Sequence, residues 1–258
     1  MKTVLPYLPD RPPKPRNYGL TMVMDKGLSI REAEDFMSVG SDYTDYVKLG
    51  FGTSLITPGF MKKIEIYKKA GVIPYFGGTL FEAFIIRGMF KDFIKFLDEC
   101  EIDLVEVSDG SYDIDQSDKL GYIRELSKRG TVISEVGSKK KEVVYTPDQW
   151  VAMMRAELDA GSVKVIAEAR ESGTTGIYND DGSINNSIID AISEHVRLEN
   201  VIWEAPMKSQ QAWFIKHFGA NVNLGNIAPA EIIPLESLRQ GLRGDTFFQF
   251  LPANLKNK

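Results

Sequence analysis

Short apolar segments alternate along the chain with longer segments in which apolar residues recur at helical spacing. Eight of the short segments have the length of a β-strand. They are Leu20–Met24, Tyr46–Leu49, Val72–Phe76, Leu104–Val107, Val132–Val136, Val165–Ala167, Val201–Trp203 and Val222–Leu224. The segments between them are long enough for right-handed helical crossovers between parallel strands. Eight strands that alternate with helices predict an α/β fold, the TIM (β/α)8 barrel.

The ends of the intervening helices are marked by residues that cap helix termini. Ser29 with Glu32, and Thr146 with Gln149, have the spacing of a capping box, the second with a proline at the first helical position. Thr57–Pro58 predicts a further helix start. Four glycines that precede predicted strands are expected to end helices: Gly71, Gly130, Gly161 and Gly219. The boundaries therefore support a regular alternation of strand and helix.

Four of the predicted strands end in one pattern, an apolar residue, any residue, a glutamate, and then Val or Ala. The glutamates are Glu106, Glu135, Glu168 and Glu204. The carboxyl ends of barrel strands meet at one mouth, so these side chains are predicted to gather there. Two carboxylates about 6 Å apart repel by roughly 3 kcal/mol at an effective dielectric of about 20, so the cluster requires a cation or a proton. An open doubly wound sheet is the alternative fold, but it gives no reason for charges at nearly every strand end.

Length and composition restrict the domain organisation and the function classes. The 258 residues suit one barrel over residues 17–258, preceded by a proline-rich arm over residues 1–16. A net charge of −5 gives no indication of nucleic-acid binding. The chain has no apolar run of about 18 residues and no signal-peptide pattern, so we expect a cytoplasmic protein without a membrane segment. Cys100 is the single cysteine and precludes an internal disulfide.

Polar residues and glycines follow the predicted strands. Lys48, Lys139 and Arg170 would bring positive charge to the mouth, and glycines let backbone N–H groups approach an anion. The only histidines, His195 and His217, lie within helical patterns, which disfavours a zinc site. Oxygen ligands favour Mg²⁺ or Mn²⁺. The mouth is therefore predicted to bind an anionic substrate together with a divalent cation.

Seven strings of residues carry a family resemblance. KLGFGTS, GGTLFE, VEVSDG, SEVGSK, EARESGTTG, WEAP and NVNLGNI occur in this order. From about Tyr18 to Phe248, the chain resembles the phosphosulfolactate synthase family. The resemblance implies a TIM-barrel lyase that adds sulfite to phosphoenolpyruvate in a Mg²⁺-dependent reaction and yields (R)-2-phospho-3-sulfolactate. Archaeal relatives use this product towards coenzyme M, bacterial relatives are associated with sulfolactate, and plant relatives include heat-stress-associated proteins.

Roles in this reaction can be assigned to the charged residues of the mouth. Lys139 is our choice for the acid that protonates C2, and Lys48 is the alternative acid or a partner of the phosphate. The metal ligands are expected among the four glutamates, with Glu106 assigned to catalysis. The assigned ligands are Glu135, Glu168 and Glu204.

The substrate-binding groups are expected around the same mouth. Arg170 is predicted to hold a phosphate or carboxylate through two hydrogen bonds. Backbone N–H groups at Gly78 or Ser138 would hold another oxyanion. Asn223 and Asn226, in the segment that ends the eighth predicted strand, are expected to serve the loop that follows it, a frequent phosphate site in barrels. Glu82, three residues after Thr79, is left open between a helix cap and a catalytic group.

Two alternative functions remain at the level of sequence. One is a barrel aldolase that forms a Schiff base through Lys48 or Lys139. The other is a non-enzymatic, heat-stress-associated barrel protein, which the intact strand-end charges disfavour. We expect a homo-oligomer that acts on small molecules, without nucleic-acid or membrane partners.

Overall fold

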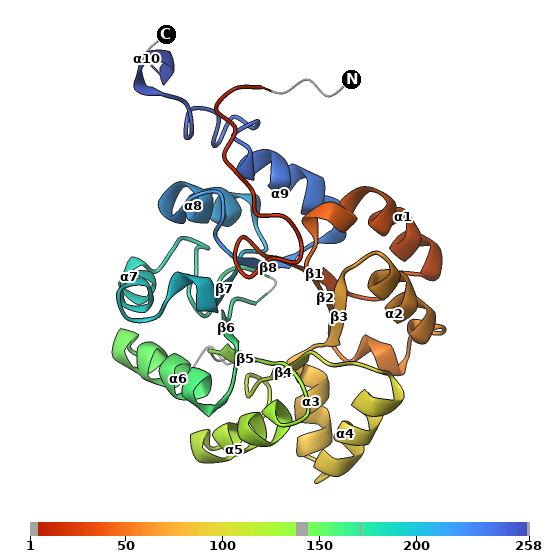
Figure 1. Ribbon diagram of the computed structural model, residues 1–258. Helices are drawn as coiled ribbons and strands as arrows, with labels where there is room; N and C mark the ends of the chain where they lie inside the picture. Colours follow the sequence, from red (N-terminus) through yellow and green to blue (C-terminus); the bar gives the residue numbers. More distant parts are fainter. Residues whose placement is uncertain (1–4, 138–143, 171, 257–258) are drawn as a thin grey trace.

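A computed structural model describes residues 5–137, 144–170 and 172–256. Its parallel strands pair in sequence order and close into a barrel that is surrounded by helices (Figure 1). The predicted TIM barrel is confirmed. The strands are β1 Thr21–Asp25, β2 Tyr46–Leu49, β3 Ile73–Phe76, β4 Val105–Val107, β5 Val132–Val136, β6 Lys164–Ala167, β7 Val201–Glu204 and β8 Leu224–Ile227.

The helices lie on the outside of the barrel, where those up to α8 lie between consecutive strands and α9 and α10 follow β8. They are α1 Ile30–Gly40, α2 Phe60–Lys69, α3 Gly78–Ile85, α4 Phe90–Glu99, α5 Gln116–Ser127, α6 Pro147–Ala160, α7 Asn186–His195, α8 Lys208–Phe218, α9 Ile232–Arg239 and α10 Ala253–Lys256. Short 3₁₀ turns follow at Ser41–Tyr43, Thr53–Leu55, Leu198–Asn200 and Pro229–Glu231. Within the described ranges, we find no helix with the length and apolar character needed to span a membrane.

Local capping chemistry sets several helix ends. Both capping boxes are confirmed, at Ser29 for α1 and at Thr146 for α6. Gly161 and Gly219 end α6 and α8 with φ values of 123° and 91°, which disfavour side-chain-bearing residues. The predicted helix start at Thr57–Pro58 is wrong, because α2 begins only at Phe60.

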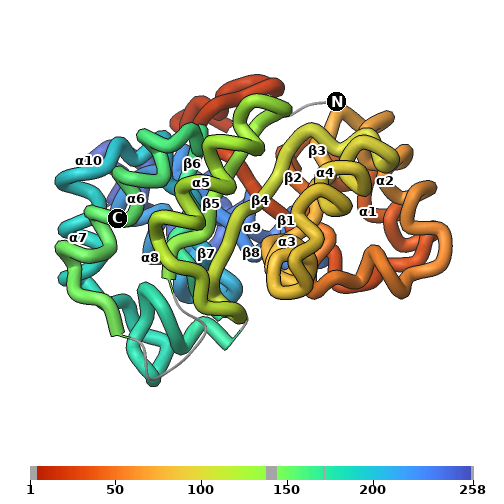
Figure 2. The backbone as a smooth tube through the Cα atoms, turned by 90° about the horizontal axis from the view of Figure 1, so that it is seen from below, coloured from red at the N-terminus to blue at the C-terminus, as the bar shows by residue number. Residues whose placement is uncertain are grey.

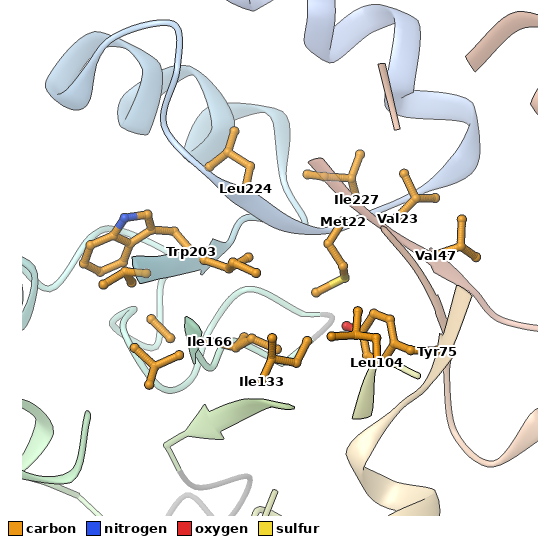
Figure 3. Packing of buried hydrophobic residues seen from close by; sticks show 14 of the residues in the cluster. Met22, Val23, Val47, Tyr75, Leu104, Ile133, Ile166, Trp203, Leu224 and Ile227 are labelled. Carbon is orange, nitrogen blue, oxygen red and sulfur yellow. The ribbon is translucent and has the colours of Figure 1, made fainter. Parts of the chain in front are cut away.

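Side chains alternate along the strands between the barrel interior and the helix layer. Trp203 stacks on Phe214 of α8 at 5.2 Å between ring centroids, so its neighbours Ile202 and Glu204 face inward. Figure 3 shows Met22, Ile133 and Tyr75 close together inside the barrel, with Trp203 turned away from them. Residues two positions apart on a strand point to the same side. Where an apolar residue points into the barrel core, the glutamate two positions later therefore also points inward, at the mouth of the barrel.

The proline-rich arm packs across the amino-terminal end of the strands. Arg11 pairs with Glu236 of α9 at 3.1 Å and with Asn221 at 2.5 Å. Arg16 pairs with Asp45, the residue before β2, at 2.9 Å. Figure 2 shows this arm, in red, at the opposite end of the barrel from the teal loop that follows β6. The arm thus covers one end of the barrel and leaves the carboxyl ends of the strands to form the site.

Candidate active site

A pocket of about 490 Å³ lies at the carboxyl ends of the strands. It receives the penultimate residue of β2, the last residue of β7 and residues of the loop after β6. Six of the residues predicted for the site line it: Lys48, Glu135, Glu168, Arg170, Glu204 and Asn226. Residues that are distant in sequence therefore share one concave site, as expected for the mouth of a barrel.

Lys48 lies among the glutamates. Its Nζ is 2.8 Å from Glu106 Oε1, 3.1 Å from Glu135 Oε2 and 3.9 Å from Glu204 Oε1. All four side chains are buried. Burial alone would lower the pKa of Lys48, but the Glu106 and Glu135 carboxylates outweigh it and raise this pKa well above its ordinary value. Lys48 is therefore held as an ammonium ion, which is a poor nucleophile for a Schiff base.

The carboxylate of Glu106 is held by the first residue of α3. The backbone N–H of Gly78 donates to Glu106 Oε1 at 2.6 Å. A side chain at Gly78 would collide with the Ser108 hydroxyl, so glycine is required for this close approach. The N–H group that we expected to face a substrate is thus engaged by Glu106. Gly78 contributes to the site through this carboxylate.

Glu135, Glu168 and Glu204 form a group of carboxylates with the chemistry of a metal site. One oxygen from each lies within 4.8 Å of the other two, and all three residues are buried. Oxygen atoms bound about 2.1 Å from a Mg²⁺ ion lie up to about 4.2 Å apart, so small side-chain adjustments would bring the three oxygens around one ion. The donor set consists of oxygen alone and fits a hard divalent cation.

The electrostatics of Glu204 also favour a cation in this group. Burial, reinforced by the Glu135 carboxylate and opposed by Lys48, raises the pKa of Glu204 to about 7. Glu204 Oε2 accepts a hydrogen bond from the Ala169 N–H at 3.0 Å and one from Asn226 Nδ2 at 3.4 Å. One oxygen is thus fixed by neighbouring groups, while the other faces Lys48.

Arg170 and Ser172 bring polar groups from the loop after β6 to the pocket wall. A guanidinium group can bind a phosphate or carboxylate through paired hydrogen bonds. Two residues assigned to the site from sequence, Ser138 and Lys139, lie outside the described residues. Their roles stay predictions.

The placement of Asn223 corrects a prediction. Strand β8 runs from Leu224 to Ile227, later than the predicted strand, so Asn223 precedes it at the opposite end of the barrel. Its side chain accepts from the Leu20 N–H at 3.0 Å and donates to the carbonyl oxygens of Glu199 and Val201. Asn223 therefore joins neighbouring strands and does not reach the substrate pocket. The pairing of β8 with β1 shifts register between Leu224 and Ile227, where Asn226 has a φ of 56°, and the apolar pattern could not reveal this irregularity.

Glu82 is neither a helix cap nor a pocket residue. Gly77 is the N-cap of α3, and Glu82 lies buried in this helix. Its Oε2 accepts from the backbone N–H groups of Ser111 and Tyr112, both at 2.8 Å, and the Ser108 hydroxyl donates to Oε1. Glu82 thus anchors the loop after β4, which contributes Ser111 to the pocket.

Sequence reasoning missed the polar groups that support the site. Tyr75 lies opposite Lys48 in the β2–β3 register, and burial together with Glu106 raises the pKa of its hydroxyl well above its usual value. Lys119 of α5 bonds to Asp109 at 2.9 Å and to the carbonyl oxygen of Glu135 at 2.7 Å. A lysine on the buried face of a helix was the signal that could have identified Lys119.

Comparison with known proteins relates the chain to one family. The family model of (2R)-phospho-3-sulfolactate synthase (ComA) matches residues 9–245. Phosphosulfolactate synthase of Methanocaldococcus jannaschii is 43% identical over 235 residues, which cover 89% of this chain and 94% of that protein. Protein HEAT-STRESS-ASSOCIATED 32 of Arabidopsis thaliana is 26% identical, over 89% of this chain and 88% of that protein.

Among solved structures, the barrel itself recurs. The crystal structure of 3-hexulose-6-phosphate synthase from Salmonella typhimurium aligns with a TM-score of 0.57 and 14% sequence identity. The alignment covers 87% of this chain and 100% of that chain. At this identity the similarity shows a shared fold alone.

Proposed function

Because this chain belongs to the (2R)-phospho-3-sulfolactate synthase family, we propose that it adds sulfite to phosphoenolpyruvate and forms (R)-2-phospho-3-sulfolactate. The observation that carries the proposal is the pocket in which buried Glu135, Glu168 and Glu204 lie beside two cationic side chains, Lys48 and Arg170. Both substrates are anions, and a pocket that combines a candidate cation site with fixed positive charge suits them.

We propose Mg²⁺ as the cofactor, held by Glu135, Glu168 and Glu204. When bound, the ion would stabilise the negative charge that develops on the substrate carboxylate as sulfite attacks. The close spacing and all-oxygen chemistry of the three carboxylates support this assignment.

The reaction requires one new bond to sulfur and one to hydrogen. The lone pair on the sulfur of sulfite forms a bond to the methylene carbon C3, and the electron pair of the double bond moves toward C2, which takes a proton. Lys139 is proposed to deliver that proton. Lys48 remains charged among Glu106, Glu135 and Glu204 and would attract the substrate phosphate or carboxylate. Arg170 would bind a second anionic group from the pocket wall.

The aldolase alternative receives less support. A Schiff-base lysine must lose its proton before it attacks a carbonyl group, and the carboxylates around Lys48 oppose that loss. Borohydride treatment with a carbonyl substrate would trap a covalent adduct if this alternative held. The non-enzymatic alternative rests on a relative of only 26% identity. A cytoplasmic location and a homo-oligomeric state stay predictions from the sequence.

An assay of purified protein tests the proposed function. We expect phosphoenolpyruvate to be consumed only when sulfite and Mg²⁺ are both present. EDTA should stop the reaction, and added Mg²⁺ should restore it. The absence of sulfite-dependent consumption in folded, Mg²⁺-supplied protein would refute the proposal.

A further inference from the structure

Lys119 is a charged residue in the helix layer of the barrel. Helix α5 buries Lys119, Ile123 and Leu126 together, and Lys119 is only 1% exposed. A lysine in such a position loses the hydration of its ammonium group, a cost that nearby opposite charges must offset. The position would ordinarily be occupied by an apolar side chain.

The contacts of Lys119 join three separate elements. Its Nζ donates to Asp109 Oδ1 at 2.9 Å and to the carbonyl oxygen of Glu135 at 2.7 Å, and it lies 2.8 Å from Glu157 Oε1. Asp109 belongs to the loop after β4, Glu135 is the penultimate residue of β5, and Glu157 lies in α6. One ammonium group therefore ties two mouth-forming segments to a helix behind them.

The contact with Glu135 bears directly on the pocket. The carboxylate of Glu135 enters the pocket and lies 3.1 Å from Lys48, while its carbonyl group is bound by Lys119 from the helix layer. A buried ion pair gives little net stability, because well-packed apolar side chains of similar volume perform as well. Groups that hold metal-binding side chains from behind do affect the site, by orienting those side chains.

We propose that Lys119 is a positioning residue of the active site, which fixes the backbone of Glu135 and the loop after β4 so that the Glu135 carboxylate is correctly placed. This inference rests on the proposed function, in which Glu135 is a metal ligand. Lys119 acts through Glu135, which is the one pocket-lining residue among its hydrogen-bond and ion-pair partners in the described part of the chain.

A double variant, Lys119→Met/Glu157→Gln, tests the proposal. Loss of Lys119 alone would leave Glu157 as an uncompensated buried charge and would endanger folding. The double variant removes both charges with little change in side-chain volume. We expect it to fold, with a near-UV circular dichroism spectrum like that of the wild type. Its Mg²⁺ affinity by calorimetry and its kcat/KM for phosphoenolpyruvate should each fall about 10- to 100-fold.

The single variant Glu157→Gln is the matched control. It keeps the hydrogen bonds from Lys119 to Asp109 and to the Glu135 carbonyl group. Its Mg²⁺ affinity and kcat/KM should therefore stay close to those of the wild type. A folded double variant that also kept wild-type values of both would overturn the proposal.

If this double variant does not fold, Lys119→Gln/Glu157→Gln decides the matter. The two amide groups can hydrogen-bond to each other, so neither is left buried without a partner, and the ammonium contacts with Asp109 and with the Glu135 carbonyl group are removed. Weaker Mg²⁺ binding in this folded variant supports positioning, and unchanged Mg²⁺ binding overturns it. Wild-type protein without phosphoenolpyruvate turnover would contradict the proposed function instead, and Mg²⁺ titration would still compare the variants.

Discussion

The ammonium group of Lys48 lies 2.8 Å from Glu106 Oε1, and both side chains are buried in the barrel mouth. The same lysine contacts Glu135 at 3.1 Å, so a single charge partly neutralises two carboxylates. Glu168 and Glu204 add further negative charge to the same small region. This imbalance is the physical reason for proposing that a divalent cation completes the site.

Lys48→Met should destabilise the metal-free protein. Glu106 and Glu135 would lose their buried cationic partner, a change that typically lowers the free energy of unfolding by about 3–5 kcal/mol. Urea denaturation in EDTA measures this value. Lys62→Met is the control, because Lys62 is 57% exposed and its ion pair with Glu65 in α2 lies at the surface. Equal stabilities of the two variants would contradict the importance of the Lys48 contacts.

Mg²⁺ should raise the thermal midpoint of the wild-type protein. A ligand that binds only the folded state stabilises it by about 2.7 kcal/mol at a concentration 100 times its Kd. Glu168→Gln removes one proposed ligand and should abolish most of this rise, whereas Glu99→Gln, on the exposed end of α4, should not. Thermal denaturation across a MgCl₂ series tests the metal assignment. An identical rise in Glu168→Gln and wild type would exclude Glu168 as a ligand.

The two cationic roles should separate in steady-state kinetics. Arg170→Ala removes an anion-binding group that acts in the ground state and transition state alike, so KM for phosphoenolpyruvate should rise roughly 10- to 100-fold with little change in kcat. Lys139→Ala should lower kcat strongly and leave KM nearly unchanged, because proton delivery matters only in the transition state. If Arg170→Ala lowered kcat and Lys139→Ala raised KM instead, Arg170 would be the proton donor and Lys139 the anion-binding residue.

Cys100 provides a test of burial through pH. Burial raises the pKa of its thiol to about 11, whereas the pKa of an unfolded cysteine is about 8.5. Between these values the folded protein keeps a proton that the unfolded chain loses, so stability falls as pH rises. The free energy of unfolding should therefore fall more steeply over this window in the wild type than in Cys100→Val. If the free energy of unfolding depended on pH in the same way in both proteins, the pKa of the Cys100 thiol would not be raised by folding.

The sequence carried enough information for the barrel and for the phase of the four glutamates. Because side chains alternate along a strand, an inward-pointing Ile166 requires that Glu168, two positions later, also points inward. This alternation can be recognised from a few neighbouring residues of the sequence. Asn223 was misplaced because β8 starts two residues later than its apolar pattern suggested. Side-chain alternation does not show at which residue a strand begins or ends when tertiary contacts set these boundaries.

The supporting residues were harder to predict for a different reason. Glu82 and Lys119 act on loops after other strands, and their partners Ser111 and Asp109 become neighbours only when the barrel closes. Helix periodicity could mark Lys119 as a core position, but it could not name the backbone group that Lys119 binds.

The most direct test of the account is ³¹P NMR of phosphoenolpyruvate incubated with sulfite, Mg²⁺ and the purified protein. We predict that the phosphoenolpyruvate signal is replaced by that of a single new phosphate monoester, and that mass spectrometry of this product shows one added sulfonate group. The conversion should be lost in EDTA and strongly slowed in Glu135→Gln. An unchanged phosphoenolpyruvate signal with folded wild-type protein, or full conversion without any divalent cation, would contradict the central claim.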